Sequence, residues 1–190
     1  MARLIERYGP IGLKPRRVST FQSLTRAIIH QQLSGKAAGT IFARFRNLYP
    51  EKRFPSAGDV LGTPPEKLRE VGLSRAKATY IMDLAARVSD RTVPGLKACE
   101  KLTDEELILR LTEVKGVGRW TAEMLLIFNL GREDLLPVDD LGVRRGFQLA
   151  NGHEEMPVAG ALAEYGRRWS PYRSFAALYL WKAADGAAGG

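Results

Sequence analysis

The strongest constraint on the fold is a glycine-containing break between two helix patterns. Thr103 followed by Glu106 is a capping box, which predicts a helix start. Lys115-Gly116-Val117-Gly118 interrupts that helix, and a second helix is predicted from Arg119. Helical spacing relates the apolar residues Leu107, Leu111 and Val114 before the break, and Ala122, Leu125 and Leu126 after it. The pattern predicts a helix-hairpin-helix.

The hairpin glycines suit a binding role. Gly116 and Gly118 permit a tight turn and let the backbone approach another molecule closely. The first N–H groups of the next helix lack intrahelical partners, which suits a phosphate. The alternative interpretation is an ordinary corner, with glycine placed after the end of the first helix.

Two adjacent carboxylates come next. An apolar, proline-containing segment, residues 135–138, ends the second helix, and Asp139 and Asp140 precede a third predicted helix. One of these aspartates is expected to be the N-cap of that helix. Because a carboxylate repels a nearby phosphate, a second acid beside this hairpin indicates a chemical role.

The composition indicates which partners and which kinds of site are possible. The 190 residues carry a formal net charge of +8, which favours nucleic acid first and an anionic membrane surface second. A merely soluble basic protein is the alternative. Cys99 is the single cysteine, so an intramolecular disulfide and a four-cysteine iron–sulfur site are excluded. No apolar run has transmembrane length and no signal peptide is found, so a cytoplasmic or otherwise intracellular protein is expected.

The remaining patterns predict an all-α fold, because no segment alternates with period two over a useful length. Residues 1–18 contain two glycines and two prolines and are expected to be an irregular arm. The last helix is expected to run from Phe175 to about Trp181. Residues 184–190 are too poor in apolar bulk to order, which predicts a disordered tail after a folded domain of residues 19–183.

The chain resembles the helix-hairpin-helix (HhH-GPD) superfamily of DNA glycosylases, and it is most similar to the alkylation-repair branch typified by 3-methyladenine DNA glycosylase II. The similarity covers about residues 20–182. The segments that carry it are Gly116-Val117-Gly118-Arg119-Trp120-Thr121-Ala122, Pro137-Val138-Asp139-Asp140-Leu141, Ile28-Ile29-His30-Gln31-Gln32-Leu33-Ser34, and Arg168-Trp169-Ser170-Pro171-Tyr172-Arg173-Ser174 through Trp181. Because the chain begins almost at the helical core, a member without the N-terminal β-rich domain is expected.

The resemblance implies two helical lobes with the active site in the cleft between them. It implies hydrolysis of the N-glycosidic bond of alkylated bases, of the 3-methyladenine and 7-methylguanine type, after the nucleotide is flipped out of double-stranded DNA. It also implies a monomer that uses no nucleotide cofactor and does not act at a membrane.

The resemblance assigns the chemistry to Asp140. In the superfamily the catalytic aspartate is followed by an aliphatic residue three positions later and a basic residue five positions later. Val143 and Arg145 satisfy this spacing for Asp140, whereas Asp139 fits it less well. Asp139 is therefore expected to cap the helix or to support the site from behind. Whether Asp140 acts as a general base or only stabilises charge stays open.

Two tryptophans are expected to line the base pocket. Trp120 occupies the position of the nucleophilic lysine of lyase-active members, so no Schiff base can form there and a monofunctional enzyme is expected. Trp181 matches an aromatic residue that faces the extruded base. Together the rings would attract a positively charged alkylated base. The alternative for each is a tryptophan that merely packs in the core or between helices.

The remaining contacts follow from the family. Gln32, or alternatively Leu33, is expected to fill the space that the flipped nucleotide leaves in the duplex. Gly116, Val117, Gly118 and Arg119 are expected to contact the DNA backbone. No catalytic cofactor is expected, but a structural Na⁺ or K⁺ is implied at the backbone carbonyls of Thr112, Val114 and Val117. Two other functions stay open: a DNA-binding module without chemistry, and a glycosylase for deaminated or etheno bases.

Overall fold

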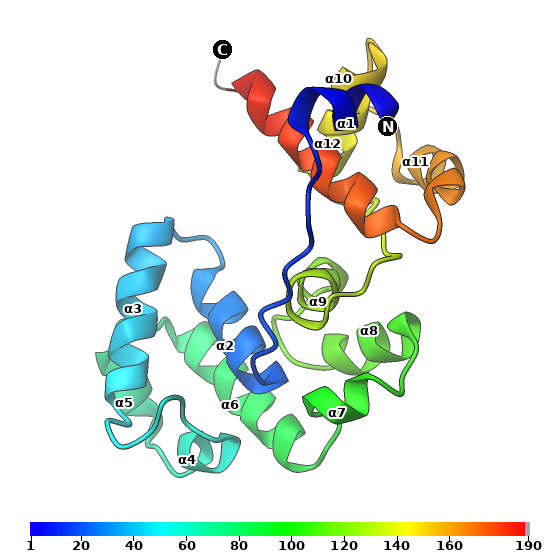
Figure 1. Cartoon of the computed structure of the whole chain (residues 1–190). Helices are drawn as coiled ribbons and strands as arrows, with labels where there is room; N and C mark the ends of the chain where they lie inside the picture. The colour runs from blue at the N-terminus through cyan, green and yellow to red at the C-terminus, as the bar shows by residue number, and fades with distance from the viewer. Residues whose placement is uncertain (189–190) are drawn as a thin grey trace. The chain divides into compact units, whose positions relative to one another are not determined.

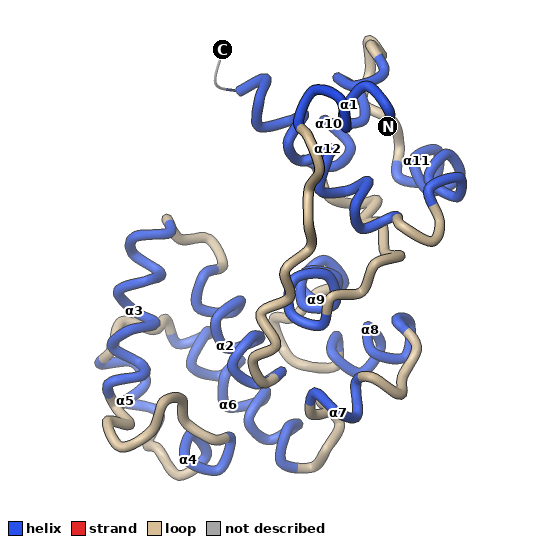
Figure 2. The backbone as a smooth tube through the Cα atoms, in the orientation of Figure 1, coloured by secondary structure: helices blue, strands red, loops and turns tan. Residues whose placement is uncertain are grey.

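The computed structural model describes residues 1–188, which form helices joined by loops, with no strand in that range (Figure 2). The all-α prediction is therefore confirmed. The chain forms two compact units, one comprising residues 17–125 and the other comprising residues 1–16 together with the chain from Leu126 onward. No helix of residues 1–188 combines the length and apolarity needed to cross a membrane.

The unit of residues 17–125 is called the hairpin unit here. Its helices are α2 (Thr20–His30), α3 (Gly35–Asn47), α4 (Ala57–Leu61), α5 (Pro65–Glu70), α6 (Arg75–Ser89), α7 (Leu96–Cys99), α8 (Asp104–Thr112) and α9 (Arg119–Leu125). Helix α6 packs against α2 and α4 (Figure 1). The core of the hairpin unit includes Leu24, Ile28, Ile81 and Leu84, all fully buried. The apolar stripes at helical spacing therefore form one core.

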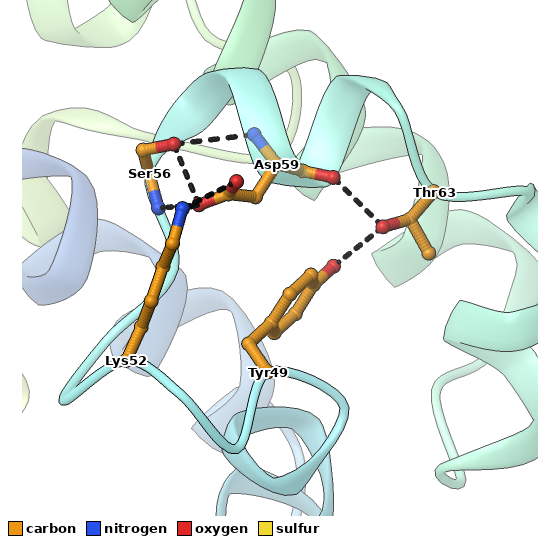
Figure 3. A network of polar contacts seen from close by, with 5 residues as sticks. All are labelled: Tyr49, Lys52, Ser56, Asp59 and Thr63. Carbon is orange, nitrogen blue, oxygen red and sulfur yellow. Dashed lines mark hydrogen bonds and ion pairs between the residues drawn. The ribbon is translucent and has the colours of Figure 1, made fainter.

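A polar network in this unit ties the chain after α3 to α4 (Figure 3). Ser56 and Asp59 form a reciprocal capping box at the start of α4, and Lys52 Nζ lies 2.7 Å from Asp59 Oδ1. Tyr49 Oη lies 2.8 Å from Thr63 Oγ1, which donates to the carbonyl of Asp59. The hydrogen bonds from Lys52 and Ser56 lower the pKa of Asp59 to about 2. This carboxylate therefore stabilises the corner in its charged form.

The other unit is called the aspartate unit. It contains α1 (Ala2–Tyr8), the π-helical turn η1 (Leu126–Leu130), α10 (Leu141–Asn151), α11 (Ala159–Gly166), the 3₁₀ turn η2 (Arg167–Trp169) and α12 (Arg173–Ala188). Helix α12 packs against α10 and α1. The α10–α12 crossing is close because Gly146 has no side chain: a Cβ there would lie 1.9 Å from the carbonyl oxygen of Leu180.

Both predicted chain ends are wrong. The expected irregular arm contains helix α1, because Leu4 is buried in the core of the aspartate unit. The chain after α1 is also held there, since the Tyr179 hydroxyl accepts from the N–H of Ile11 and donates to the carbonyl of Gly9. The expected tail is helical as far as Ala188, because α12 continues past Trp181 with Ala183 buried against the same core. Residues 189–190 of that expectation lie outside the described residues.

Candidate active site and nucleic-acid interface

Asp140 is the N-cap of α10, with two defined hydrogen bonds to one carboxylate oxygen. Its Oδ1 accepts from the backbone N–H of Val143 and from the indole Nε1–H of Trp181, each at 2.8 Å. The cap sets the position of the carboxylate relative to α10, and the indole sets its rotation. The expectation that Asp139 caps this helix is wrong, because the adjacent residue already does so. The Asp139 side chain is instead exposed.

The indole of Trp181 has two close neighbours besides Asp140. Its ring centroid lies 5.7 Å from that of Phe128, with 33° between the ring planes. The second neighbour is Gly142, where a Cβ would approach Trp181 Cδ1 to 2.9 Å and Asp140 Oδ1 to 3.1 Å. A glycine at this position therefore leaves room for the indole N–H to reach the carboxylate.

The loop that delivers Asp140 is anchored to the start of α12. The hydroxyl of Ser174, a fully buried side chain, accepts from the N–H of Leu135 and donates to backbone carbonyls of the loop. The Asp134 carboxylate accepts from Arg173 Nε at 2.6 Å and from the hydroxyl of Ser170. The Arg173 hydrogen bond lowers the pKa of Asp134. These contacts hold residues 132–135 against the start of α12, the helix that also carries Trp181.

In the hairpin unit, the turn between α8 and α9 has the geometry that its glycines predict. Gly116 has φ +78°, and a Cβ there would lie 2.3 Å from the ring of Tyr80. The N–H of Val117 donates to the carbonyl of Val114 at 3.0 Å. The expected contact between Val117 and the DNA backbone therefore cannot use the Val117 N–H, because that group is bonded inside the turn. Space is open where a Gly118 side chain would project.

Arg119 lies at the start of α9 and is held by two acids. Its Nη2 lies 2.6 Å from Glu105 Oε1, and its Nε lies 3.1 Å from Glu123 Oε1. The hydrogen bond to Arg119 lowers the pKa of Glu105, and the same bond raises the pKa of Arg119. Arg119 therefore clamps α8 to α9, and a DNA phosphate would have to compete with Glu105 for it.

The loop after α2 carries the predicted wedge residues. Gln32 has φ +54°, a left-handed conformation that non-glycine residues rarely adopt, and its side chain is exposed. Leu33 is 40% exposed. The amide Nε2 of Gln31 donates to the carbonyl of Gly116 at 2.8 Å, so this loop and the hairpin are joined. The Nζ of Lys77 donates to the carbonyls of Ile29 and Gln31 at 2.8 and 2.7 Å.

A pocket of about 680 Å³ opens between these segments of the hairpin unit. Trp120 lies at its wall and is 50% exposed, so the core-packing alternative for this residue is wrong. The volume lies within the range of small-ligand sites. The lining residues are Ala27, His30, Gln31, Gln32, Ser74, Ala76, Lys77, Tyr80, Gly116, Trp120, Thr121 and Met124.

Each unit thus collects part of the predicted site. The hairpin unit brings together Gln32, Leu33, Trp120 and the turn of residues 116–118, and the aspartate unit brings together Asp140 and Trp181. Sequence reasoning missed Phe128, Gly142, Tyr80 and Lys77. A basic residue in the apolar pattern of α6 was the one signal that could have indicated Lys77.

Five arginines of the aspartate unit carry charge suited to the DNA backbone, but each has a partner within the unit. The contacts are Arg144 Nε to the carbonyl of Pro157, Arg145 to Gln148, Arg167 to Glu164, Arg168 over the ring of Tyr165, and Arg173 to Asp134.

Three comparisons identify relatives of the chain. The family model described as "HhH-GPD superfamily base excision DNA repair protein" matches residues 25–171. DNA-3-methyladenine glycosylase 1 of Schizosaccharomyces pombe is 35% identical over 182 residues, which cover 96% of this chain and 79% of that protein. A Bacillus halodurans DNA-3-methyladenine glycosidase structure superimposes with a TM-score of 0.90 at 36% identity, covering 99% of this chain and 85% of that one.

A further structure bears on the partner. The S. pombe 3-methyladenine DNA glycosylase in complex with abasic DNA superimposes with a TM-score of 0.80 at 36% identity, covering 95% of this chain and 89% of that one. The helical architecture, the hairpin and the matched relatives lead to one classification. The chain belongs to the HhH-GPD superfamily of base excision DNA repair proteins, within its branch of 3-methyladenine DNA glycosylases.

Proposed function

We propose that this chain is a monofunctional DNA glycosylase that removes alkylated bases, of the 3-methyladenine and 7-methylguanine type, from double-stranded DNA. The observation that carries the proposal is the Asp140 carboxylate, oriented by the N–H of Val143 and the indole of Trp181. The names of the matched relatives support the substrate class, and the abasic-DNA complex of the S. pombe relative supports DNA as the partner.

The chemistry follows from the charge of the lesion. An alkylated purine of this type carries a formal positive charge, so it leaves with the electron pair of the glycosidic bond and needs no strong acid. Positive charge then develops on the sugar, as in other glycoside hydrolysis. The Asp140 carboxylate stabilises that charge electrostatically. A water oxygen bonds to C1′ and its proton is lost, either to Asp140 or to solvent.

Lyase activity requires an amine nucleophile, and Trp120 supplies none. Lys77 lines the same pocket, and burial lowers the pKa of its ammonium group. Its Nζ donates to two backbone carbonyls, however, and it therefore serves as a hydrogen-bond donor in this arrangement. Water is accordingly the proposed nucleophile, and the product is an abasic site in an unbroken strand.

Aromatic faces account for the preference for charged lesions. A cation over an aromatic ring gains roughly 0.5–2 kcal/mol, and an undamaged base lacks that gain. Trp120 lines the pocket of the hairpin unit, and Trp181 lies beside the Asp140 carboxylate. The same site would bind a neutral deaminated or etheno base less tightly than an alkylated one.

The hairpin is proposed to bind the DNA backbone at the amides of Gly116 and Gly118, with a structural Na⁺ or K⁺ at the carbonyls of Thr112, Val114 and Val117. Carbonyl oxygens are suitable ligands for hard cations. The Val114 carbonyl accepts a hydrogen bond from the N–H of Val117, and a carbonyl oxygen has a second lone pair that suits an ion. Bound there, the ion would supply positive charge beside a phosphate. We further infer a monomer that needs no nucleotide cofactor and acts on DNA inside the cell.

The test is base release from methylated duplex DNA. Free 3-methyladenine and 7-methylguanine should appear, detected by mass spectrometry, and strands should stay intact until alkali is added. Release of hypoxanthine or ethenoadenine alone, from matched duplexes, would move the assignment to another lesion. DNA binding without any base release would indicate a binding module. Covalent trapping with borohydride would contradict the monofunctional assignment.

A further inference from the structure

Lys77 makes contacts that the proposed chemistry does not explain. It lies in the first turns of α6, and its ammonium reaches across to the end of α2, where it donates to the carbonyls of Ile29 and Gln31. Carbonyls in the last turn of a helix have no intrahelical partner. A cation is favourable at this end of a helix, because the helix dipole is negative there. Lys77 therefore caps α2 from a different element.

The segment that Lys77 holds has a restricted conformation. Helix α2 ends at His30, and the next helix begins at Gly35, so the chain reverses within residues 31–34. Gln32 takes a left-handed conformation in this turn. Such a conformation is unfavourable for a non-glycine residue and persists where surrounding contacts impose it. The two bonds from Lys77 and the bond from Gln31 to Gly116 are contacts of that kind.

We propose that Lys77 is a positioning residue that holds the turn of residues 31–34 so that the exposed Gln32 side chain can fill the space left by the flipped nucleotide. This rests on the proposed function. It adds that the wedge is set by an ammonium group anchored on α6. Gln31, which is hydrogen-bonded to the hairpin, also fixes the position of the wedge relative to the phosphate-binding turn.

The experiment measures affinity for a duplex with a stable abasic-site analogue, relative to an intact duplex, by fluorescence anisotropy. Local opening of the duplex is followed by the fluorescence of a 2-aminopurine placed beside the abasic site. Lys77→Met should reduce the preference for the abasic duplex roughly ten-fold, as expected for lost charge-assisted hydrogen bonds. Its affinity for intact duplex should change far less. Lys67→Met, which removes a solvated lysine of α5 paired with Glu70, is the matched control and should match the wild type.

A double-mutant cycle with Gln32→Ala separates a positioning role of Lys77 from an effect on the stability of the protein. If Lys77 acts through Gln32, the double variant Lys77→Met/Gln32→Ala should be no worse than Gln32→Ala alone. Additive losses, or an equal loss of intact-duplex binding, would contradict the proposal. Restoring the amine gives an independent check: Lys77→Cys treated with bromoethylamine regains an ammonium at nearly the same reach. Cys99 is buried, so the reagent should select position 77.

The outcomes for this inference and for the proposed function are distinct. If the wild type releases bases and Lys77→Met prefers the abasic duplex as strongly as the wild type does, the role of Lys77 is overturned. The glycosylase assignment then stays intact. No wild-type base release, together with a Lys77-dependent preference for abasic duplex, would overturn the enzyme assignment and keep the positioning role. Failure of the aminoethylated cysteine to regain the preference would also count against the role of the ammonium.

Discussion

Substitution of Gly142 by alanine should reduce activity without a matching loss of stability. The added methyl would lie 2.9 Å from Trp181 Cδ1 and 3.1 Å from Asp140 Oδ1. Ordinary contact begins near 3.4 Å, so the indole must retreat by about 0.5 Å. The Nε1–Oδ1 distance of 2.8 Å would then exceed the usual hydrogen-bond range.

The magnitude follows from the lost bond. A hydrogen bond to a charged group contributes about 1.5–3 kcal/mol. If the carboxylate must keep its orientation in the transition state, the rate of base release should fall about 10- to 100-fold. Alanine in place of glycine within a helix gains roughly 0.5–1 kcal/mol, which offsets part of the steric cost to folding. The melting temperature should therefore change little.

The assay is single-turnover release of 7-methylguanine, with thermal unfolding measured on the same samples. Gly160→Ala is the matched control, because that helical glycine of the same unit has open space at its Cβ position. Trp181→Phe removes the donor outright, and adding Gly142→Ala to it should cause no further loss. Full activity of Gly142→Ala, or an equal loss in Gly160→Ala, would refute the reasoning.

Two further predictions concern stability. Gly146→Ala should destabilise the aspartate unit by about 1–3 kcal/mol or more, because the methyl would overlap the backbone carbonyl of Leu180. Calorimetry should show a lower melting temperature. An unchanged melting temperature would contradict the close crossing of α10 and α12. Asp59→Asn should lower the melting temperature near neutral pH. Because the folded pKa of Asp59 is about 2, below its unfolded value of 3.8, the wild-type advantage should persist above about pH 4 and disappear as the pH falls toward 2. An advantage independent of pH would contradict the role of the charge.

The helices and the hairpin could be predicted because their signals are local. The Thr103–Glu106 capping box forms as expected, and Gly116 has the positive φ that its place in the turn suggested. The helix after Asp140 begins where the paired acids indicated. Each of these depends on residues a few positions apart, because a side-chain cap or the φ of a single glycine decides it.

The errors concern long-range packing. Helix α1 and the end of α12 are weak patterns alone, but they order because Leu4 and Ala183 are buried in the same core. The choice of Asp140 as cap could not be separated from Asp139 by pattern, since both precede the same helix. The Trp181–Asp140 bond joins residues 41 positions apart, so no local spacing could indicate it. Gly142 acquires its importance from that bond.

The role of Asp140 is tested most directly by comparing 7-methylguanine release and abasic-duplex binding for the wild type, Asp140→Asn and Asp139→Asn. The exposed neighbour Asp139 serves as a control for the charge of the loop. We expect Asp140→Asn to bind DNA at least as well as the wild type but to lose most turnover, whereas Asp139→Asn should keep its turnover. Comparable excision by Asp140→Asn, or selective loss in Asp139→Asn, would contradict the assignment of the chemistry to Asp140.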